Sequence, residues 1–192
     1  ITWENITILA VISSSIIMAL AGGFMYFTLV QCFFPEDLEK RLLQQKYFLL
    51  TLIYLFGSIN YAHISQALWQ HGTVQLFTIL AVLALYKKRY FLMGLCFGLM
   101  LISRPTSGVA VVLLCILALK NWLSKKQVFF KNEGSLSILI TRLKSLIPWV
   151  AKVFLGILIP LLFFLWYNNK YYGSISNQGY SNQVFTEWKG RF

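Results

Sequence analysis

Acidic residues are scarce in this 192-residue chain, which has 6 Asp and Glu against 17 Lys and Arg. Charged residues of both signs make up only 12% of the chain and hydrophobic residues make up 58%. Soluble domains are usually about 25% charged and about 45–50% apolar. Both departures argue against an ordinary soluble domain. They predict an all-α integral membrane protein, because helices satisfy their own backbone hydrogen bonds in lipid.

The net charge of +11 would suggest a nucleic-acid partner in a soluble protein. Here the basic residues lie between apolar runs instead of covering one surface. That pattern is typical of membrane topology and of contact with anionic lipid headgroups. We therefore expect membrane lipid, and no nucleic acid, as a partner.

Residues that commonly bind metals or carry out catalysis are also few. The chain has no Gly-rich phosphate loop, no HExxH motif and no Cys/His cluster with metal-ligand spacing. Its three cysteines are widely spaced and lie within or beside apolar runs, so they are expected to be small residues of membrane helices. The only histidines are His63 and His71, and an alternative role for this pair is binding of a pigment or a haem.

Apolar runs and the polar segments between them predict one polytopic membrane domain with about six membrane segments. The expected order is a membrane helix at 6–34, a helical hairpin at 47–86, a second helical hairpin at 91–119, a cytoplasmic or interfacial segment at 120–146, a membrane helix at 147–167 and an extracytoplasmic loop at 168–192.

The segment 91–119 carries a single charge, Arg104, followed by Pro105. It is either one long kinked helix or a hairpin of two short helices. Each half would rise only ~16–20 Å, less than a ~30 Å hydrocarbon core. Basic residues flank the segment on both sides, at 87–89 and 120–126. The positive-inside rule then favours the hairpin, with Arg104 at its tip.

The distribution of basic residues predicts the orientation of the chain. Of the 17 Lys and Arg residues, 13 fall in the segments assigned to the cytoplasm. Only Lys170, Lys189 and Arg191 fall on the outer side, apart from Arg104. This bias predicts that the N-terminus lies outside and that the chain lacks an upstream helix or is an unusual N-out protein.

Several polar groups converge on the expected outer side and form a candidate site. An arginine at membrane depth is energetically costly, so it indicates a functional site, and its guanidinium suits a phosphate or pyrophosphate. The alternative is that Arg104 caps carbonyls freed by Pro105 or extends to the interface. The predicted substrate- and lipid-phosphate-binding residues are Arg104, Thr106, His71, Gln70, Trp69, Tyr167, Asn168, Lys170, Tyr172 and Tyr180.

Three stretches occur in an order that resembles a known family: the turn "WQHG" at 69–72, the run "GLCFGLMLISRPT" at 94–106, and "YNNKYYGSISNQGY" at 167–180. The chain resembles, over residues 40 to 192, the bacterial membrane glycosyltransferases of the GT-C superfamily. These are relatives of the protein O-mannosyltransferases and of the aminoarabinose transferase of lipid A.

The resemblance implies a GT-C like fold in the bacterial cytoplasmic membrane and a polyprenyl-phosphate-linked sugar donor, bound on the extracytoplasmic side. The sugar would pass to a lipid, glycan or protein acceptor. The family also places an acidic general base or ligand of a divalent metal in its first outer loop. The helix at 6–34 would correspond to the family's second helix, so we expect this chain to lack the first helix and that loop. Glu4 and Glu187 are the only carboxylates on the expected outer side.

Two other functions stay open from the sequence. The chain could be a non-catalytic membrane subunit or scaffold of a larger complex, including a degenerate relative of the glycosyltransferases that packs against other membrane subunits. A transporter is the third possibility, since the two hairpins weakly suggest a repeat, but transporters usually carry paired intramembrane charges.

Overall fold

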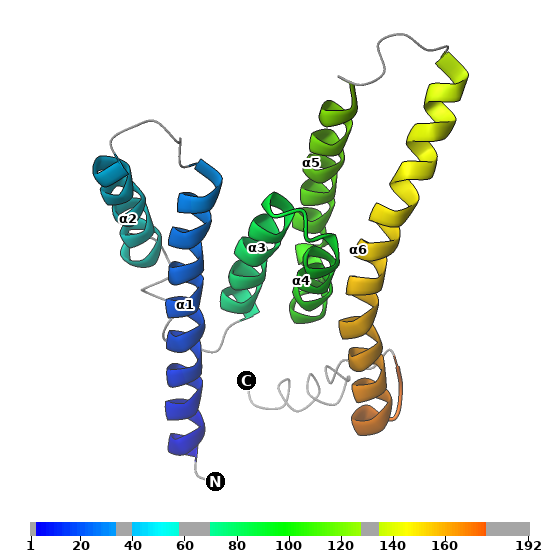
Figure 1. The fold of residues 1–192 in the computed structure, drawn as a ribbon. Coiled ribbons are helices and arrows are strands. Elements are labelled where there is room, and N and C mark those ends of the chain that lie inside the picture. Colours follow the sequence, from blue (N-terminus) through cyan, green and yellow to red (C-terminus); the bar gives the residue numbers. More distant parts are fainter. Residues whose placement is uncertain (1–2, 34–39, 58–69, 128–134, 176–192) are drawn as a thin grey trace.

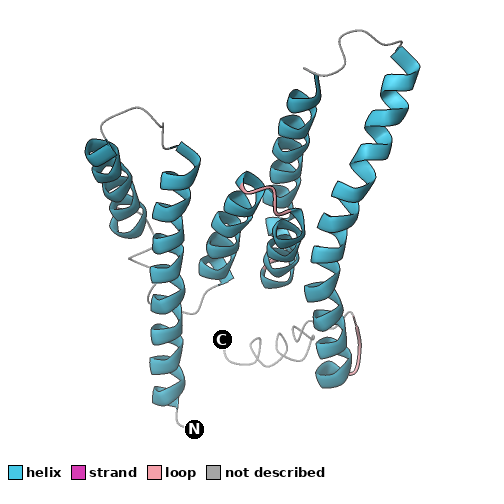
Figure 2. Ribbon diagram, viewed as in Figure 1, coloured by secondary structure: helices cyan, strands magenta, loops and turns pink. Residues whose placement is uncertain are grey.

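The structure is a computed structural model that describes residues 3–33, 40–57, 70–127 and 135–175. In these ranges the chain is all-helical, with six α-helices, one 3₁₀ helix and no strand (Figure 2). The elements are α1 (Trp3–Phe33), α2 (Lys40–Phe56), α3 (Gln70–Tyr86), α4 (Tyr90–Ser103), η2 (Pro105–Ser107), α5 (Gly108–Gln127) and α6 (Ser135–Tyr172).

Two helices contain segments long and apolar enough to cross a membrane, Asn5–Cys32 in α1 and Leu146–Tyr171 in α6. Three shorter apolar helices cover His71–Tyr86, Tyr90–Ser103 and Pro105–Lys120. The observed helices run past several expected boundaries. Much of the expected interfacial segment 120–146 continues α5 or begins α6, and α6 extends five residues past 167.

Successive helices run between two ends of the bundle (Figure 1). At one end α1, α3 and α5 finish while α2, α4 and α6 begin; we call this the basic end. At the opposite end α2, α4 and α6 finish while α3 and α5 begin, and we call this the Arg104 end. The helices therefore alternate in direction between these two ends, and α1, α5 and α6 extend further than the shorter α3 and α4.

Helix α4 lies at the centre and makes its most extensive contacts with α6 and α3. Its side chains Met93, Phe97 and Met100 are fully buried. Gly94 and Gly98 face α6, where an added Cβ would meet the backbone of Val153 or Ile157. Such a Gly-x-x-x-Gly spacing lets two helix backbones approach closely, which explains the tight packing of α4 on α6.

Helix α1 packs between the outlying α2 and the central α3. On the α2 side, an added Cβ at Gly22 would meet Leu55, and the rings of Tyr26 and Phe48 contact edge to face, with 6.4 Å between their centroids. The two arms of the expected hairpin 47–86 are thus both neighbours of α1. A hydrogen bond of 2.6 Å from the Tyr54 hydroxyl to the Gln75 side-chain oxygen joins them directly.

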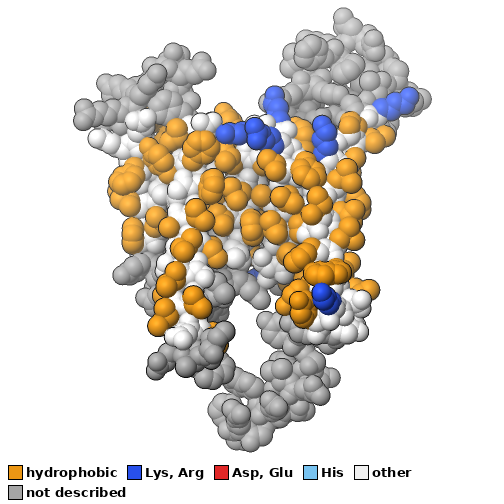
Figure 3. All heavy atoms as spheres, turned by 60° about the horizontal axis from the view of Figure 1, so that its bottom comes forward, with side chains coloured by type: hydrophobic (Ala, Val, Ile, Leu, Met, Phe, Trp, Pro, Cys, Tyr) orange, Lys and Arg blue, Asp and Glu red, His pale blue; other side chains and the backbone are white. Residues whose placement is uncertain are grey.

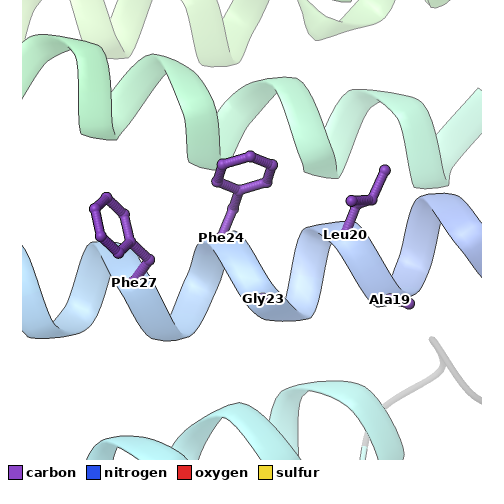
Figure 4. Close-up of a pocket in the computed structure, with 5 residues that line it drawn as sticks. All are labelled: Ala19, Leu20, Gly23, Phe24 and Phe27. Atoms are coloured by element: carbon purple, nitrogen blue, oxygen red, sulfur yellow. The ribbon is translucent and has the colours of Figure 1, made fainter.

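On the α3 side of α1, Leu20 and Phe24 point toward α3 (Figure 4). They lie in an apolar groove of about 390 Å³ that Ala19, Gly23 and Phe27 complete. The ammonium of Lys87, just beyond α3, lies 4.8 Å from the centre of the Phe27 ring. A cation and an apolar surface therefore meet where α1 approaches the basic end.

The surface combines an apolar belt with an uneven distribution of charge (Figure 3). Large apolar side chains are exposed along α1, α2, α5 and α6, and Val109 reaches 71% exposure. Seven exposed cations lie toward the basic end: Lys46, Lys87, Lys88, Arg89, Lys120, Lys144 and Lys152. Among the side chains that the structure describes, the opposite end has only Arg104 and Lys170 as cations.

Candidate functional site

Pro105 ends helix α4 and exposes the functional groups beside it. A proline disfavours the helical conformation of the residue before it, and Arg104 is extended, with φ −155° and ψ 110°. The Arg104 amide still donates to the Met100 carbonyl at 2.9 Å, so the arginine completes the last turn. The Ser107 amide donates back to the Arg104 carbonyl at 2.9 Å, and α5 begins directly afterwards.

The Arg104 side chain reaches the first turn of α3, where it contacts His71. Its Nη1 atom lies 2.8 Å from Nδ1 and 2.7 Å from Nε2 of the imidazole. A neutral imidazole has one acceptor nitrogen, so the guanidinium donates to whichever ring nitrogen is deprotonated. This contact joins two predicted site residues that are 33 positions apart, and it orients the arginine at the Arg104 end.

The backbone at this end adds further positive character. Helices α3 and α5 both begin here, and the first N–H groups of a helix have no partner within it. Those groups carry the positive end of the helix dipole. Together with the Arg104 guanidinium, they make the Arg104 end electrostatically favourable for an anion.

Two hydroxyl residues follow Arg104 in η2. Thr106, a predicted site residue, is exposed, whereas Ser107 is buried. The Ser107 hydroxyl has no hydrogen-bond partner among the atoms that the structure describes. Buried polar atoms are rarely left without one, so Ser107 is a further donor or acceptor at this end. The sequence predicts Thr106 as a site residue. The 3₁₀ turn decides that Ser107, and not Thr106, is the buried hydroxyl.

The C-terminal part of α6 corrects the expectation of a loop from residue 168. Asn168, Lys170 and Tyr172 all belong to the helix. Asn168 is only 1% exposed, and its Nδ2 donates to the Ile175 carbonyl at 3.3 Å. Gly173, with φ +70°, turns the chain back after the helix. In the structure, then, Asn168 holds the end of α6 through this hydrogen bond.

Tyr167 and Lys170 lie on an exposed aromatic surface of α6. The Tyr167 and Tyr171 rings are 4.6 Å apart, and the Lys170 ammonium lies 5.1 Å from the Trp166 ring centre. Clusters of this kind are typical of the boundary between lipid and water. Tyr167 also contacts Phe163, and the Lys170 ammonium lies 5.9 Å from the centre of the Tyr171 ring, so these contacts join side chains of α6 itself.

Several predicted residues fall outside the described part of the structure. Trp69, Tyr180 and His63 are not described, nor are the side chains of Gln70 and Tyr172, the first residue of α3 and the last of α6. The six carboxylates of the chain also lie outside the described side chains.

The described donor groups do not fit a divalent metal at the Arg104 end. A metal ion of this class binds carboxylate, carbonyl or imidazole groups, and a guanidinium repels it. Within the described ranges, no three His, Cys, Asp or Glu residues gather into a potential metal site. The acceptor nitrogen of His71 that a haem iron would require already accepts from Arg104. The described site is thus suited to an anion.

Comparisons of the chain with protein-family models, with curated proteins and with solved structures gave no match.

Proposed function

We propose that this chain is a membrane glycosyltransferase, or part of one, whose Arg104 end binds the phosphate of a polyprenyl-phosphate sugar. Arg104 is the anchor for that phosphate, and His71 holds the guanidinium in position. The observation that carries the proposal is the Arg104–His71 contact at the end of an otherwise apolar bundle.

Membrane insertion is the first step of the proposal. Helix α1 would span ~46 Å and α6 ~57 Å at 1.5 Å per residue, enough to cross a ~30 Å hydrocarbon core. Contiguous exposed apolar faces on four helices suit lipid better than water. The cations at the basic end support a position for that end in the bacterial cytoplasm, by the positive-inside rule, and for the Arg104 end outside.

Phosphate recognition is the second step. A guanidinium has five N–H donors and stays charged, so Arg104 keeps donors for phosphate oxygens while Nη1 contacts His71. The N-termini of α3 and α5 add a favourable dipole. The apolar groups that surround this end suit the isoprenoid tail of the same ligand.

The chemistry follows from where charge develops. An acceptor hydroxyl attacks the anomeric carbon of the sugar, the bond from that carbon to the phosphate oxygen breaks, and the phosphate leaves with the electron pair. The hydroxyl proton passes to a base, a role that the resemblance gives to an acidic residue of an outer loop. Arg104 stabilises the charge on the departing phosphate, which lowers the barrier to cleavage.

The test is binding of undecaprenyl phosphate to the full-length protein in detergent, followed by native mass spectrometry. We expect Arg104→Ala to weaken binding by on the order of a hundredfold and Arg104→Lys by less, because lysine keeps the charge but loses the planar fork. Lys152→Ala, which removes an exposed cation near the basic end, is the matched control.

Equal affinity in the wild type and in correctly folded Arg104→Ala protein would refute the phosphate assignment. That result would leave the non-catalytic membrane subunit as the better interpretation. Sugar transfer from a labelled polyprenyl-phosphate sugar by the same variants measures the catalytic part of the proposal. A loss of binding together with unchanged transfer would contradict the role of Arg104 in leaving-group stabilisation.

A further inference from the structure

The turn between α3 and α4 presents three consecutive cations in a defined backbone geometry. The Arg89 amide donates to the Ala84 carbonyl at 2.8 Å, and the Lys88 amide donates to the Leu85 carbonyl at 3.0 Å. This pair of bonds is a Schellman motif, in which the residue at the position of Lys88 is usually glycine. Lys88 has φ +56°, a conformation that a lysine adopts at a cost in free energy.

Residues in unfavourable backbone conformations cluster at functional sites, because the surrounding structure must hold them there. Lys87, Lys88 and Arg89 are all exposed, so the turn directs three positive charges away from the packed core. The turn therefore concentrates three positive charges, which suits an anionic ligand.

An apolar groove of about 330 Å³ opens beside this turn, between α3 and α4. Lys87 and Arg89 lie at its mouth, and its walls include Phe77, Leu80, Leu92 and Leu99. From the turn to Phe77 on α3, or to Leu99 on α4, the groove extends ten residues, or about 15 Å along a helix. That length matches half of a ~30 Å hydrocarbon core, the depth of a single leaflet.

Two contacts hold the cationic turn in place beside the groove. The Lys87 ammonium lies 4.8 Å from the centre of the Phe27 ring, which holds its side chain near α1. Arg89 is the residue before α4, and its carbonyl accepts the Met93 amide at 3.0 Å, so its backbone is fixed to the helix. The positive groups thus stay at the end of the groove nearest the basic end.

We propose that this groove binds one anionic phospholipid of the leaflet at the basic end. An acyl chain lies between α3 and α4, and the phosphate contacts Lys87 and Arg89. Basic pockets between membrane helices on the cytoplasmic side bind anionic lipid headgroups by this chemistry. The site lies at the opposite end of the bundle from Arg104. It shares only membrane insertion with the proposed glycosyltransferase function.

The experiment measures lipid retention on the purified full-length chain in detergent by native mass spectrometry. The probes are dioleoyl phosphatidylglycerol and dioleoyl phosphatidylcholine, which have the same acyl chains and differ in net charge. We expect the wild type to prefer phosphatidylglycerol by on the order of tenfold, and the double variant Lys87→Gln/Arg89→Gln to lose that preference. The control Lys120→Gln/Lys152→Gln removes the same charge near the basic end and should keep it.

A second variant tests the groove itself. Leu92→Trp adds bulk at a half-exposed wall residue without changing any charge, and we expect it to weaken retention of phosphatidylglycerol. Inorganic phosphate and glycerol phosphate, added as competitors, should not displace the lipid, because they lack the chain that fills the groove. Displacement by either one at comparable concentration would instead indicate a simple phosphate site.

Two further results would overturn the proposal. If both double variants lost the preference equally, the lipid would be responding to surface charge in general. If Leu92→Trp left retention unchanged while helicity by circular dichroism matched the wild type, the groove would not hold the acyl chain. Arg104→Ala should leave this lipid bound, so failure here is distinguishable from failure of the polyprenyl-phosphate proposal.

Discussion

Gly94 of α4 and Gly156 of α6 lie where these two helices cross, each against the backbone of the other helix. An added Cβ at Gly94 would overlap the Val153 carbonyl, and one at Gly156 would overlap the Phe91 carbonyl. Both contacts involve backbone atoms, which cannot rotate away as a side chain can. The crossing therefore depends on the absence of side chains at both positions.

Replacing Gly94 with alanine should destabilise the fold by about 1–3 kcal/mol, because the added methyl group overpacks the crossing. Gly23 of α1 is the matched control, since an added Cβ there has nothing within 4 Å. Gly23→Ala should leave the fold unchanged in stability or stabilise it by up to about 1 kcal/mol, because alanine has a higher helix propensity than glycine. Unfolding in mixed micelles, followed by tryptophan fluorescence, measures both. Equal stability of the two variants would contradict the packing described for α4 and α6.

Lys88→Gly should stabilise the turn between α3 and α4 by about 1 kcal/mol, because glycine adopts the left-handed conformation without the steric penalty of a side chain. Lys120→Gly, in the helical interior of α5, should instead destabilise by about 1 kcal/mol. The same unfolding assay compares them. If Lys88→Gly lowered stability as much as Lys120→Gly, that result would contradict the left-handed conformation of Lys88. A gain in stability together with weaker retention of phosphatidylglycerol would indicate that the charge of Lys88 contributes to lipid binding.

His71 and Arg104 should act as a coupled pair in binding undecaprenyl phosphate. His71→Ala removes the acceptor that orients the guanidinium, so affinity should fall, though less than in Arg104→Ala. In a double-mutant cycle the two effects should fall short of additivity by about 1 kcal/mol, or roughly fivefold in affinity. Native mass spectrometry with the four proteins of the cycle provides the affinities. Strict additivity would show that the two side chains contribute independently.

The orientation in the membrane can be measured by cysteine labelling. In a background with Cys32, Cys96 and Cys115 replaced by serine, Ser174→Cys at the Arg104 end should react with an impermeant maleimide added to intact cells. Lys144→Cys, at the opposite end of α6, should react only after the membrane is opened. Labelling of Lys144→Cys in intact cells, with Ser174→Cys protected, would reverse the proposed orientation. Labelling of both in intact cells would argue against α6 as a span.

Features that depend on neighbouring residues could be predicted without coordinates. Pro105 acts on the conformation of Arg104 through a local clash, so the break between α4 and α5 follows from two adjacent residues. The long apolar runs predict α1 and α6 because helix length in lipid depends on composition. The predicted end of this helix at residue 167 was wrong, because α6 continues to Tyr172. Aromatic and amide side chains continue a helix as readily as they form a loop.

Contacts between distant segments could not be assigned in the same way. The sequence placed His71 and Arg104 among ten candidate residues, but which two meet depends on how α3 packs against α4. Nor could the sequence show that the turn at Gly173 brings the Ile175 carbonyl to the side chain of Asn168. Pairing of this kind depends on helix rotation and on the crossing of backbones, which hydropathy does not encode.

By itself, the sequence determined that the chain is helical, where its apolar segments lie, and that its positive charge gathers between particular runs. These are properties of composition and of residues close together in the chain. Only the tertiary structure decided that Arg104 contacts His71 and that Lys87 and Arg89 stand at the mouth of a groove between α3 and α4. The reason is physical: each arrangement depends on helices packed at a fixed rotation, and that rotation follows from close contacts such as those of Gly94 and Gly156.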